Sequence, residues 1–139
     1  MQEQGNLPAA ALSSALKACT WGFAPMGLSD DDPRYNQFSL PTKFVSYLAA
    51  GLPIITLGHP QSSVVRMGKT YGVGCCVTSE NLEVLSRDLL AVLSTKNLWA
   101  KFGPEILRCA QCEFDMRRMR QALYENLRKC AEPGGRGGA

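Results

Sequence analysis

The sequence lacks any uninterrupted apolar segment that approaches the ~20 residues of a membrane-spanning helix, and it has a single histidine, His59. Charged residues make up only 19% of its 139 residues. The formal net charge of +3 is too small to indicate nucleic-acid binding, which usually requires Lys and Arg clustered on one face. Because 45% of the residues are hydrophobic, we expect one folded, soluble domain that makes at most peripheral contact with a membrane.

The six cysteines also lack the pattern of a disulfide framework or a metal centre. Cys75 and Cys76 are adjacent in a predicted buried strand, and no apolar leader is evident, so we expect reduced thiols in a cytoplasmic protein. Cys109 and Cys112 have the C-x-x-C spacing of a zinc knuckle or a redox pair. Since no second pair with ligand spacing accompanies them, zinc or thiol chemistry is the least favoured function, and we expect no metal and no cofactor.

A helix is predicted between Pro41, which is tolerated in a first helical turn, and Gly51, which suits the residue of positive φ that ends a helix. Its expected buried side consists of apolar residues at helical spacing, namely Phe44, Val45, Tyr47 and Leu48. The other side carries Thr42, Lys43 and Ser46, which are related by three or four positions. One side should therefore pack against the protein while the other contacts a ligand.

Helices and strands are predicted to alternate along the first two thirds of the chain. Short apolar strands are expected at residues 20–26, 53–57 and 72–77, and helices at 7–19, at 41–51 and from Ser62, a serine available as a cap. Thr78 or Ser79 is expected to cap a further helix that ends near Ser94, with an inward side of leucines at positions 82, 85, 89 and 93. This alternation predicts a parallel sheet with right-handed crossovers.

The C-terminal third is predicted to be helical. We expect a short helix at 98–102, a break at Gly103-Pro104, a continuation over 105–112 and a last amphipathic helix at 113–131. One side of the last helix is apolar and comprises Met116, Met119, Leu123 and Leu127. The opposite side carries Arg117, Arg118, Arg120, Arg128 and Lys129, and basic sides of this kind are usually only solvated. Residues 133–139 are expected to form a flexible glycine-rich tail.

Ligands of parallel α/β sheets bind outside the carboxyl ends of the strands, which are here the loops at 26–43, 58–62 and 78–81. A helix N-terminus beside Lys43 is suited to hold a diphosphate. Within the first loop, Asp30, Asp31 and Asp32 form either a divalent-metal cluster or a solvated polar loop that turns at Asp32-Pro33. The turn is favoured, because consecutive carboxylates do not easily converge on one ion.

Residues 41–55, PTKFVSYLAAGLPII, preceded by Asn36 and followed by Gly72-Val-Gly74, resemble a known sequence pattern. The pattern is the P-S/T-K-x-x-E-Y-x-A-x-G-x-P-V-I run, with a later G-x-G, of the nucleotide-sugar-binding domain in GT-B glycosyltransferases of the group 1 type and their bacterial polysaccharide relatives. The similarity spans roughly residues 7–131. It implies a Rossmann-like domain that holds the nucleoside diphosphate of a UDP- or GDP-sugar.

The resemblance also implies roles for individual residues. It places Thr42 and the N–H groups of residues 40–43 against the diphosphate, with Lys43 as its charged partner. Ser46 falls where many members have a Glu or Gln that binds the ribose or the sugar, and Phe38 takes the place of a second acidic residue. His59, at the end of a strand, either approaches the donor or is a simple loop histidine. The expected nucleotide-sugar-binding residues are Ser39, Thr42, Lys43, Ser46 and His59, and no catalytic residue is assigned.

Compared with that family, the chain lacks the first half of the nucleotide-binding domain and the acceptor-binding domain. We therefore expect residues 1–132 to form half of a Rossmann-like domain, with a short parallel sheet of about three strands flanked by helices and a helical C-terminus. The edge beside Trp21 would be open, which predicts a homodimer or pairing with the missing half. The leading hypothesis is the donor-binding portion of a glycosyltransferase, inactive alone; the alternative is a non-catalytic dimerisation or interaction module.

Overall fold

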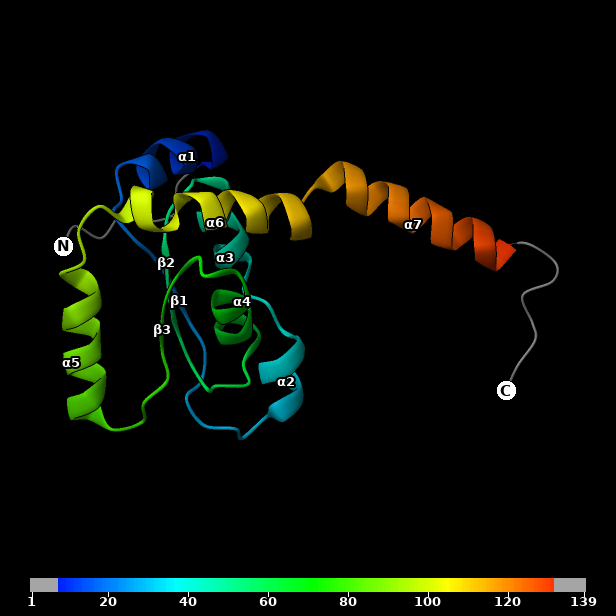
Figure 1. Ribbon diagram of the computed structural model, residues 1–139. Coiled ribbons are helices and arrows are strands. Elements are labelled where there is room, and N and C mark those ends of the chain that lie inside the picture. The colour runs from blue at the N-terminus through cyan, green and yellow to red at the C-terminus, as the bar shows by residue number, and fades with distance from the viewer. Residues whose placement is uncertain (1–7, 132–139) are drawn as a thin grey trace.

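Three parallel strands form one sheet in the computed structural model, which describes residues 8–131 (Figure 1). The strands are β1 (Gly22–Pro25), β2 (Ile54–Leu57) and β3 (Gly74–Val77), and they lie side by side in this order. Ile54 at the start of β2 is paired with Gly22 on one side and with Gly74 on the other. The predicted α/β class, with a short parallel sheet of three strands, flanking helices and a helical C-terminus, is confirmed.

Seven helices precede, connect and follow the strands within the described residues. They are α1 (Ala9–Lys17), α2 (Pro33–Phe38), α3 (Thr42–Ala49), α4 (Ser63–Tyr71), α5 (Leu82–Leu93), α6 (Leu98–Glu113) and α7 (Met116–Ala131). None of these described helices has the length and apolarity that crossing a bilayer requires. Leu7, at the start of the first predicted helix, and the predicted glycine-rich tail at 133–139 lie outside the described residues.

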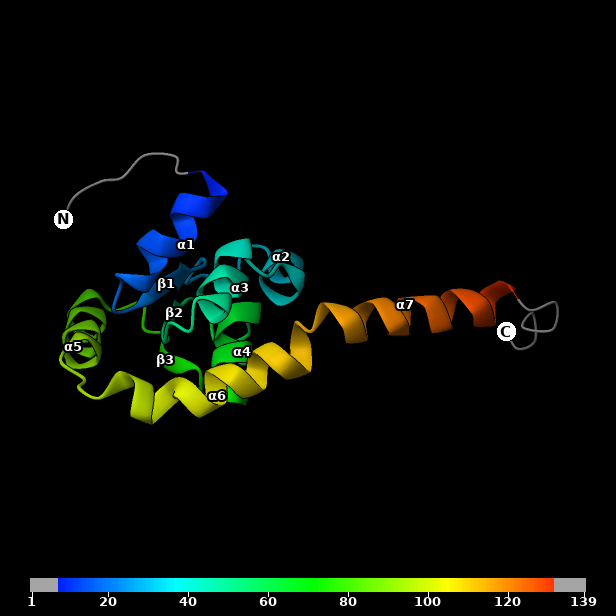
Figure 2. The ribbon, with the colours of Figure 1, turned by 90° about the horizontal axis from the view of Figure 1, so that it is seen from above.

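One face of the sheet is covered by α3 and α4, and α6 packs across both of these helices (Figure 2). The core between them contains Phe44 and Leu48 from α3, Val64 and Val65 from α4, and Phe102, Ile106 and Cys109 from α6. Glycine at position 22 permits the close approach of α3 to β1, because a Cβ there would lie 2.4 Å from the Tyr47 ring. As predicted, Phe44 and Leu48 are buried, whereas Val45 and Tyr47 are half-buried.

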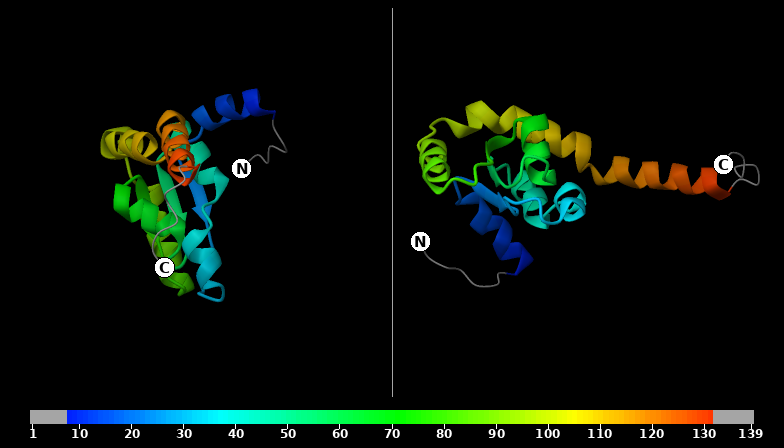
Figure 3. Two further views of the ribbon diagram at one scale, coloured as in Figure 1. Left: turned by 90° about the vertical axis from the view of Figure 1, so that its right-hand side faces the viewer. Right: turned by 90° about the horizontal axis from the view of Figure 1, so that it is seen from below.

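The opposite face of the sheet is covered only in part. Phe23 and Pro25 alternate with the buried residues of β1 and are exposed, with 45% of Phe23 accessible. Helix α5 packs against β3, at the far side of the sheet from β1 (Figure 3). Because β1 pairs only with β2 in the described part of the chain, its other side is an open edge, as the sequence predicted.

Helix α2 lies within the stretch predicted as a polar loop, so that prediction was wrong. Asp32 caps this helix by accepting a hydrogen bond from the backbone N–H of Tyr35 at 3.1 Å, and Pro33 occupies the first turn. Both residues favour a helix start, and the sequence interpretation took them for a turn. Asn36 is buried on the inner side of α2 and anchors it to the preceding loop.

Helix α6 continues through Gly103-Pro104, where a break was predicted. Gly103 lies against the indole of Trp99, since a Cβ at position 103 would be 2.8 Å from that ring. Pro104 removes one backbone hydrogen bond from the helix interior but is itself exposed. The buried side chains of Phe102 and Ile106, one on each side of the pair, hold the helix on the core and offset this loss.

The start of α5 was predicted wrongly and its inner side only in part, since Leu85 and Leu89 are half-buried as expected. Asn81, rather than Thr78 or Ser79, caps the helix, because its side-chain oxygen accepts hydrogen bonds from the N–H groups of Glu83 and Val84. None of the α5 residues is fully buried. Leu82 and Leu93, expected to face inward, are 73% and 59% exposed.

Candidate functional site

The N-terminus of α3 presents the residues that the sequence placed against a diphosphate. Thr42 and Lys43 occupy the first two positions of the helix and are both exposed. The residue before them, Pro41, forms no side-chain cap, but its carbonyl accepts a hydrogen bond from the N–H of Phe44 at 3.0 Å, which leaves the N–H groups of Thr42 and Lys43 without an acceptor inside the helix. The opposite end stops at Gly51 with φ +72°, which confirms the predicted positive φ.

Ser46 lies one turn further along α3 and is held by the helix itself. Its hydroxyl donates a hydrogen bond to the carbonyl of Thr42 at 3.2 Å. Together with Leu12 and Leu16 of α1, it lines a surface hollow of about 220 Å³. The side chain that replaces the expected acidic residue therefore has an internal partner and faces the gap between α1 and α3.

Ser39 connects the end of α2 to the beginning of α4. Its carbonyl accepts a hydrogen bond from the hydroxyl of Ser63, which also contacts the sulfur of Met26 at 3.6 Å. Arg66, one turn into α4, donates to the carbonyl of Gln37 at 2.7 Å. These contacts join the loop after β1, the end of α2 and the start of α4 at the carboxyl edge of the sheet.

A cavity of about 380 Å³ opens beside this junction, and its lining comprises Leu40, Ser63, Arg66, Met67 and Thr70. Leu40 precedes α3, whereas the other four residues belong to α4. Arg66 brings a permanent positive charge to this cavity. The sequence interpretation missed both the cavity and Arg66, because helical spacing gives no sign that α2 and α4 lie together.

Ser62, which was expected to cap α4, does occupy the cap position, but its hydroxyl forms no hydrogen bond with any described residue. The side chain is fully buried. A Cβ at position 58 would lie 3.1 Å from this hydroxyl, so Gly58 allows the strand end and the helix start to approach closely. The first turn of α4 consequently has no side-chain cap.

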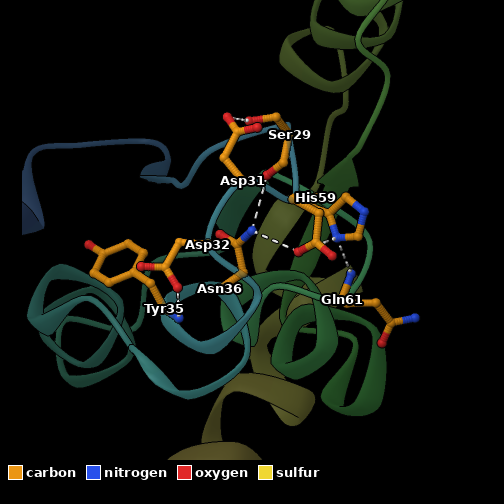
Figure 4. Close-up of polar contacts among 8 residues, drawn as sticks. Ser29, Asp31, Asp32, Tyr35, Asn36, His59 and Gln61 are labelled. Atoms are coloured by element: carbon orange, nitrogen blue, oxygen red, sulfur yellow. Dashed lines mark hydrogen bonds and ion pairs between the residues drawn. The ribbon is translucent and has the colours of Figure 1, made fainter.

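His59 follows β2 and meets the loop that follows β1 (Figure 4). Its Nδ1 accepts a hydrogen bond from the backbone N–H of Gln61 at 3.3 Å and lies 3.8 Å from a carboxylate oxygen of Asp30. Asn36 donates to that same oxygen at 3.2 Å and to the carbonyl of Ser29 at 3.0 Å. With Nδ1 acting as acceptor, the neutral imidazole carries its proton on Nε2. This cluster orients His59 at the carboxyl edge of the sheet.

The three consecutive aspartates have three different partners, and Figure 4 labels Asp31 and Asp32 among them. Asp30 lies beside His59 and Asn36, Asp31 accepts a hydrogen bond from Ser29, and Asp32 caps α2. The described residues include no group of three His, Cys, Asp or Glu side chains that could hold a metal ion. The aspartates therefore organise the loop and the start of α2.

Cys109 and Cys112 lie in very different surroundings on α6. Cys109 is buried, and this burial, with a smaller contribution from Glu113, raises the pKa of its thiol to about 11. Cys112 is exposed. A hydrogen bond from Tyr71 to Glu113 ties α4 to α6 beside them and raises the pKa of the tyrosine to about 12. A raised thiol pKa opposes the thiolate form that redox or metal chemistry needs.

The fold and this site define a parallel α/β protein whose polar residues gather at the carboxyl edge of its sheet. The predicted site residues lie in two groups. Thr42 and Ser46 are hydrogen-bonded to each other on α3, whereas His59 contacts Asp30 in the loops at the ends of the strands. Comparisons of the chain with protein-family models, with curated proteins and with solved structures each found no match.

Proposed function

We propose that this chain is the donor-binding part of a glycosyltransferase and holds the diphosphate of a UDP- or GDP-sugar at the N-terminus of α3. The observation that carries the proposal is the pair Thr42 and Lys43, exposed on a helix start without a side-chain cap. Such a helix start offers free N–H groups to phosphate oxygens, and the lysine adds a compensating charge. The sequence resemblance of residues 41–55 to donor-binding domains supports the same assignment.

The loop after β2 and helix α4 supply further donors to the proposed site. His59 has its Nδ1 engaged, so the proton on Nε2 is available to a phosphate or sugar oxygen. Arg66 lines the cavity between Leu40 and α4 and carries a fixed positive charge. The charge of Arg66 and the Nε2 proton of His59 would stabilise the diphosphate as it departs from the sugar.

The proposed role is binding rather than complete catalysis. The two positions where related sequences have acidic residues are Phe38, which is 79% exposed, and Ser46, which is bonded to Thr42. Neither can act as a carboxylate. We therefore expect this chain alone to bind the nucleotide without transferring the sugar.

The proposal is tested by calorimetric titration of the protein with UDP and GDP, each compared in the wild type and in Lys43→Ala. We expect dissociation constants in the millimolar range or tighter, weakened roughly tenfold by Lys43→Ala, because one charge-assisted contact to phosphate is lost. Lys69→Ala is the matched control, since Lys69 is equally exposed but lies in the last turn of α4. Silence with both nucleotides, or equal losses in the two variants, would contradict the proposal.

A second candidate function, a dimerisation or interaction module, is favoured by the open edge of β1 and by the exposed Phe23 beside it. An unpaired strand edge offers its backbone groups to another strand. Light scattering coupled to size exclusion should then give a dimer at tens of micromolar, and Phe23→Lys should shift it towards the monomer. Phe38→Lys changes an exposed aromatic away from the sheet and should leave the dimer intact. A clean monomer of the wild type counts against this function.

We also propose a cytoplasmic location. All six cysteines are free thiols in the structure, from the buried Cys109 to the exposed Cys19, Cys112 and Cys130. Free thiols persist where the cell keeps its proteins reduced. Mass spectrometry of the protein alkylated in cell lysate should find all six modified after denaturation; a disulfide-linked pair would contradict this location.

A further inference from the structure

Helix α7 projects away from the body of the protein (Figures 1 and 2). Every residue from 116 to 130 is exposed. None of the substantial packing contacts between described elements involves α7, whereas α6, of the same length, packs on α3 and α4. Its apolar side chains therefore lie in solvent.

These apolar side chains form a continuous stripe along α7. At 100° per residue, its members occupy a sector of about 80°. The apolar stripe of α7 consists of Met116, Met119, Leu123, Leu127 and Cys130. Met119, Leu123 and Leu127 are each more than half exposed.

The charge of the protein is concentrated on the same helix. Helix α7 contains five of the fifteen Lys and Arg residues but only one of the twelve Asp and Glu residues, so its formal charge is +4 and that of the rest of the chain is −1. Arg120 and Lys129 flank the apolar stripe on its two sides. Glu125, the single acidic residue of α7, lies about 160° from the centre of the stripe.

The start of α7 is fixed by local contacts. Asp115 accepts hydrogen bonds from the backbone N–H groups of Arg117 and Arg118, at 2.8 and 3.3 Å. The side chain of Arg118 reaches back to the carbonyl of Gln111 at 3.3 Å. The helix therefore has a defined first turn, and it has no substantial packing contact with another described element.

We propose that α7 is a membrane-surface helix that lies flat on a bilayer containing anionic phospholipid. Its sixteen residues span about 24 Å, which is shorter than the hydrocarbon core that a crossing helix must traverse. The apolar stripe enters the boundary between headgroups and acyl chains, and the flanking cations extend to the phosphates. Glu125 remains on the side that faces water. This surface is separate from the proposed nucleotide site and does not depend on it.

The charges on α7 favour an anionic surface over a second copy of the helix. Two copies packed along the apolar stripe would bring Arg120 and Lys129 of each helix beside like charges of the other. Sixteen residues also provide only about two heptads, fewer than a stable coiled coil needs. Neither objection applies to a bilayer that carries negative charge.

The test measures co-sedimentation of the full chain with vesicles of phosphatidylcholine, with or without one quarter phosphatidylglycerol. We expect binding to the mixed vesicles at least tenfold tighter than to neutral ones, and weakened by salt. Leu123→Asp and Gln121→Asp add the same charge on opposite sides of α7. The difference in vesicle binding between the two variants therefore measures the contribution of the apolar stripe. Leu123→Asp should weaken binding at least tenfold more than Gln121→Asp.

Both substituted positions are exposed, so circular dichroism and the melting temperature should match those of the wild type. Equal binding to the two kinds of vesicle, or equal losses in the two variants, overturns the proposal. It is also overturned if light scattering finds a dimer in solution that Leu123→Asp dissociates and Gln121→Asp does not. That result would assign the apolar stripe to a second copy of the chain.

Discussion

Helices α6 and α7 have the same length of sixteen residues and the same helical spacing of apolar side chains, yet they differ completely in burial. Helix α6 buries Phe102, Ile106 and Cys109. Helix α7 buries none of its side chains between residues 116 and 130. Helical spacing thus predicts an apolar face, but what covers that face depends on where the preceding elements direct the chain.

The difference begins at Phe114 and Asp115, between the two helices. Helix α6 crosses α3 and α4, which together form a layer on one face of the sheet. The helix ends at Phe114, where the backbone leaves the helical region at φ −125°, and Asp115 starts α7 in a new direction (Figure 1). From that point no described element lies alongside the chain.

The most severe test of this comparison removes one apolar side chain from each helix. Ile106→Ala should lower the free energy of unfolding by about 3 kcal/mol, because it leaves a cavity in the core beneath α6. Leu123→Ala should change it by less than about 0.5 kcal/mol, since Leu123 is 57% exposed. Urea denaturation of both variants measures the two changes. Comparable losses would mean that α7 packs against the protein in solution.

A second test concerns the proline inside α6. Pro104→Ala should raise the free energy of unfolding by roughly 2 kcal/mol, because it restores a backbone hydrogen bond at an exposed interior position. Pro33→Ala is the control, since Pro33 lies in the first turn of α2, where proline removes no helical bond. A loss of stability in Pro104→Ala would show that the ring itself contributes to packing.

The pH dependence of stability provides a third test, because two groups with raised pKa values lie on α6 and at its contact with α4. Burial raises the pKa of Cys109 from 9.0 to about 11, and the bond to Glu113 raises that of Tyr71 from 10.0 to about 12. At a pH between the ordinary pKa and the raised pKa of each group, the group is largely deprotonated in the unfolded chain but still protonated in the folded chain. Stability should therefore fall as pH rises from about 9 to 12.

Denaturation series at several pH values should follow this decline in the wild type. Cys109→Ser should flatten the part between pH 9 and 11, and Tyr71→Phe should flatten the part between pH 10 and 12. Wild-type stability that is constant over this range would contradict the assignment of both groups.

The smallest effect is expected in the chemistry of two thiols and leaves the fold unchanged. Cys109 of α6 should react with iodoacetamide at least tenfold more slowly than the exposed Cys130 of α7, because Cys109 is buried and this burial raises the pKa of its thiol. Peptide mass spectrometry after timed labelling gives both rates in one sample. Equal rates would indicate that Cys109 is as accessible to the reagent in solution as the exposed Cys130.

The parallel α/β fold could be predicted because the residues that favour helix ends and strands in the sequence occur where the structure has helix ends and strands. Gly51 ends α3 at positive φ, and the β-branched run before Leu57 forms the central strand. The continuous α6 could not be predicted in the same way. Its path through Pro104 depends on the burial of Phe102 and Ile106 against α3 and α4, contacts that local sequence rules do not contain.

Only the part of the candidate site that lies on a single helix could be predicted from the sequence. Thr42 and Lys43 follow from the helix start itself. The contact between Asp30 and His59 joins loops that are far apart in the chain, and Arg66 reaches the end of α2 from α4. An aspartate cap at Asp32, followed by Pro33 in the first turn, was the one available signal for α2, and recognising it would have placed Asn36 on a helix.

The order of the strands in the sheet is also their order in the chain, so each strand pairs with the one that a ribosome has released before it. Strands β1 and β2 can meet as soon as Leu57 has emerged, and β3 then adds to the growing edge. The apolar sides of α3 and α4 nevertheless stay uncovered until Ile106 and Cys109 of α6 follow. We therefore expect the sheet to assemble during synthesis before its core is closed, and in that interval these two helices would be accessible to a chaperone.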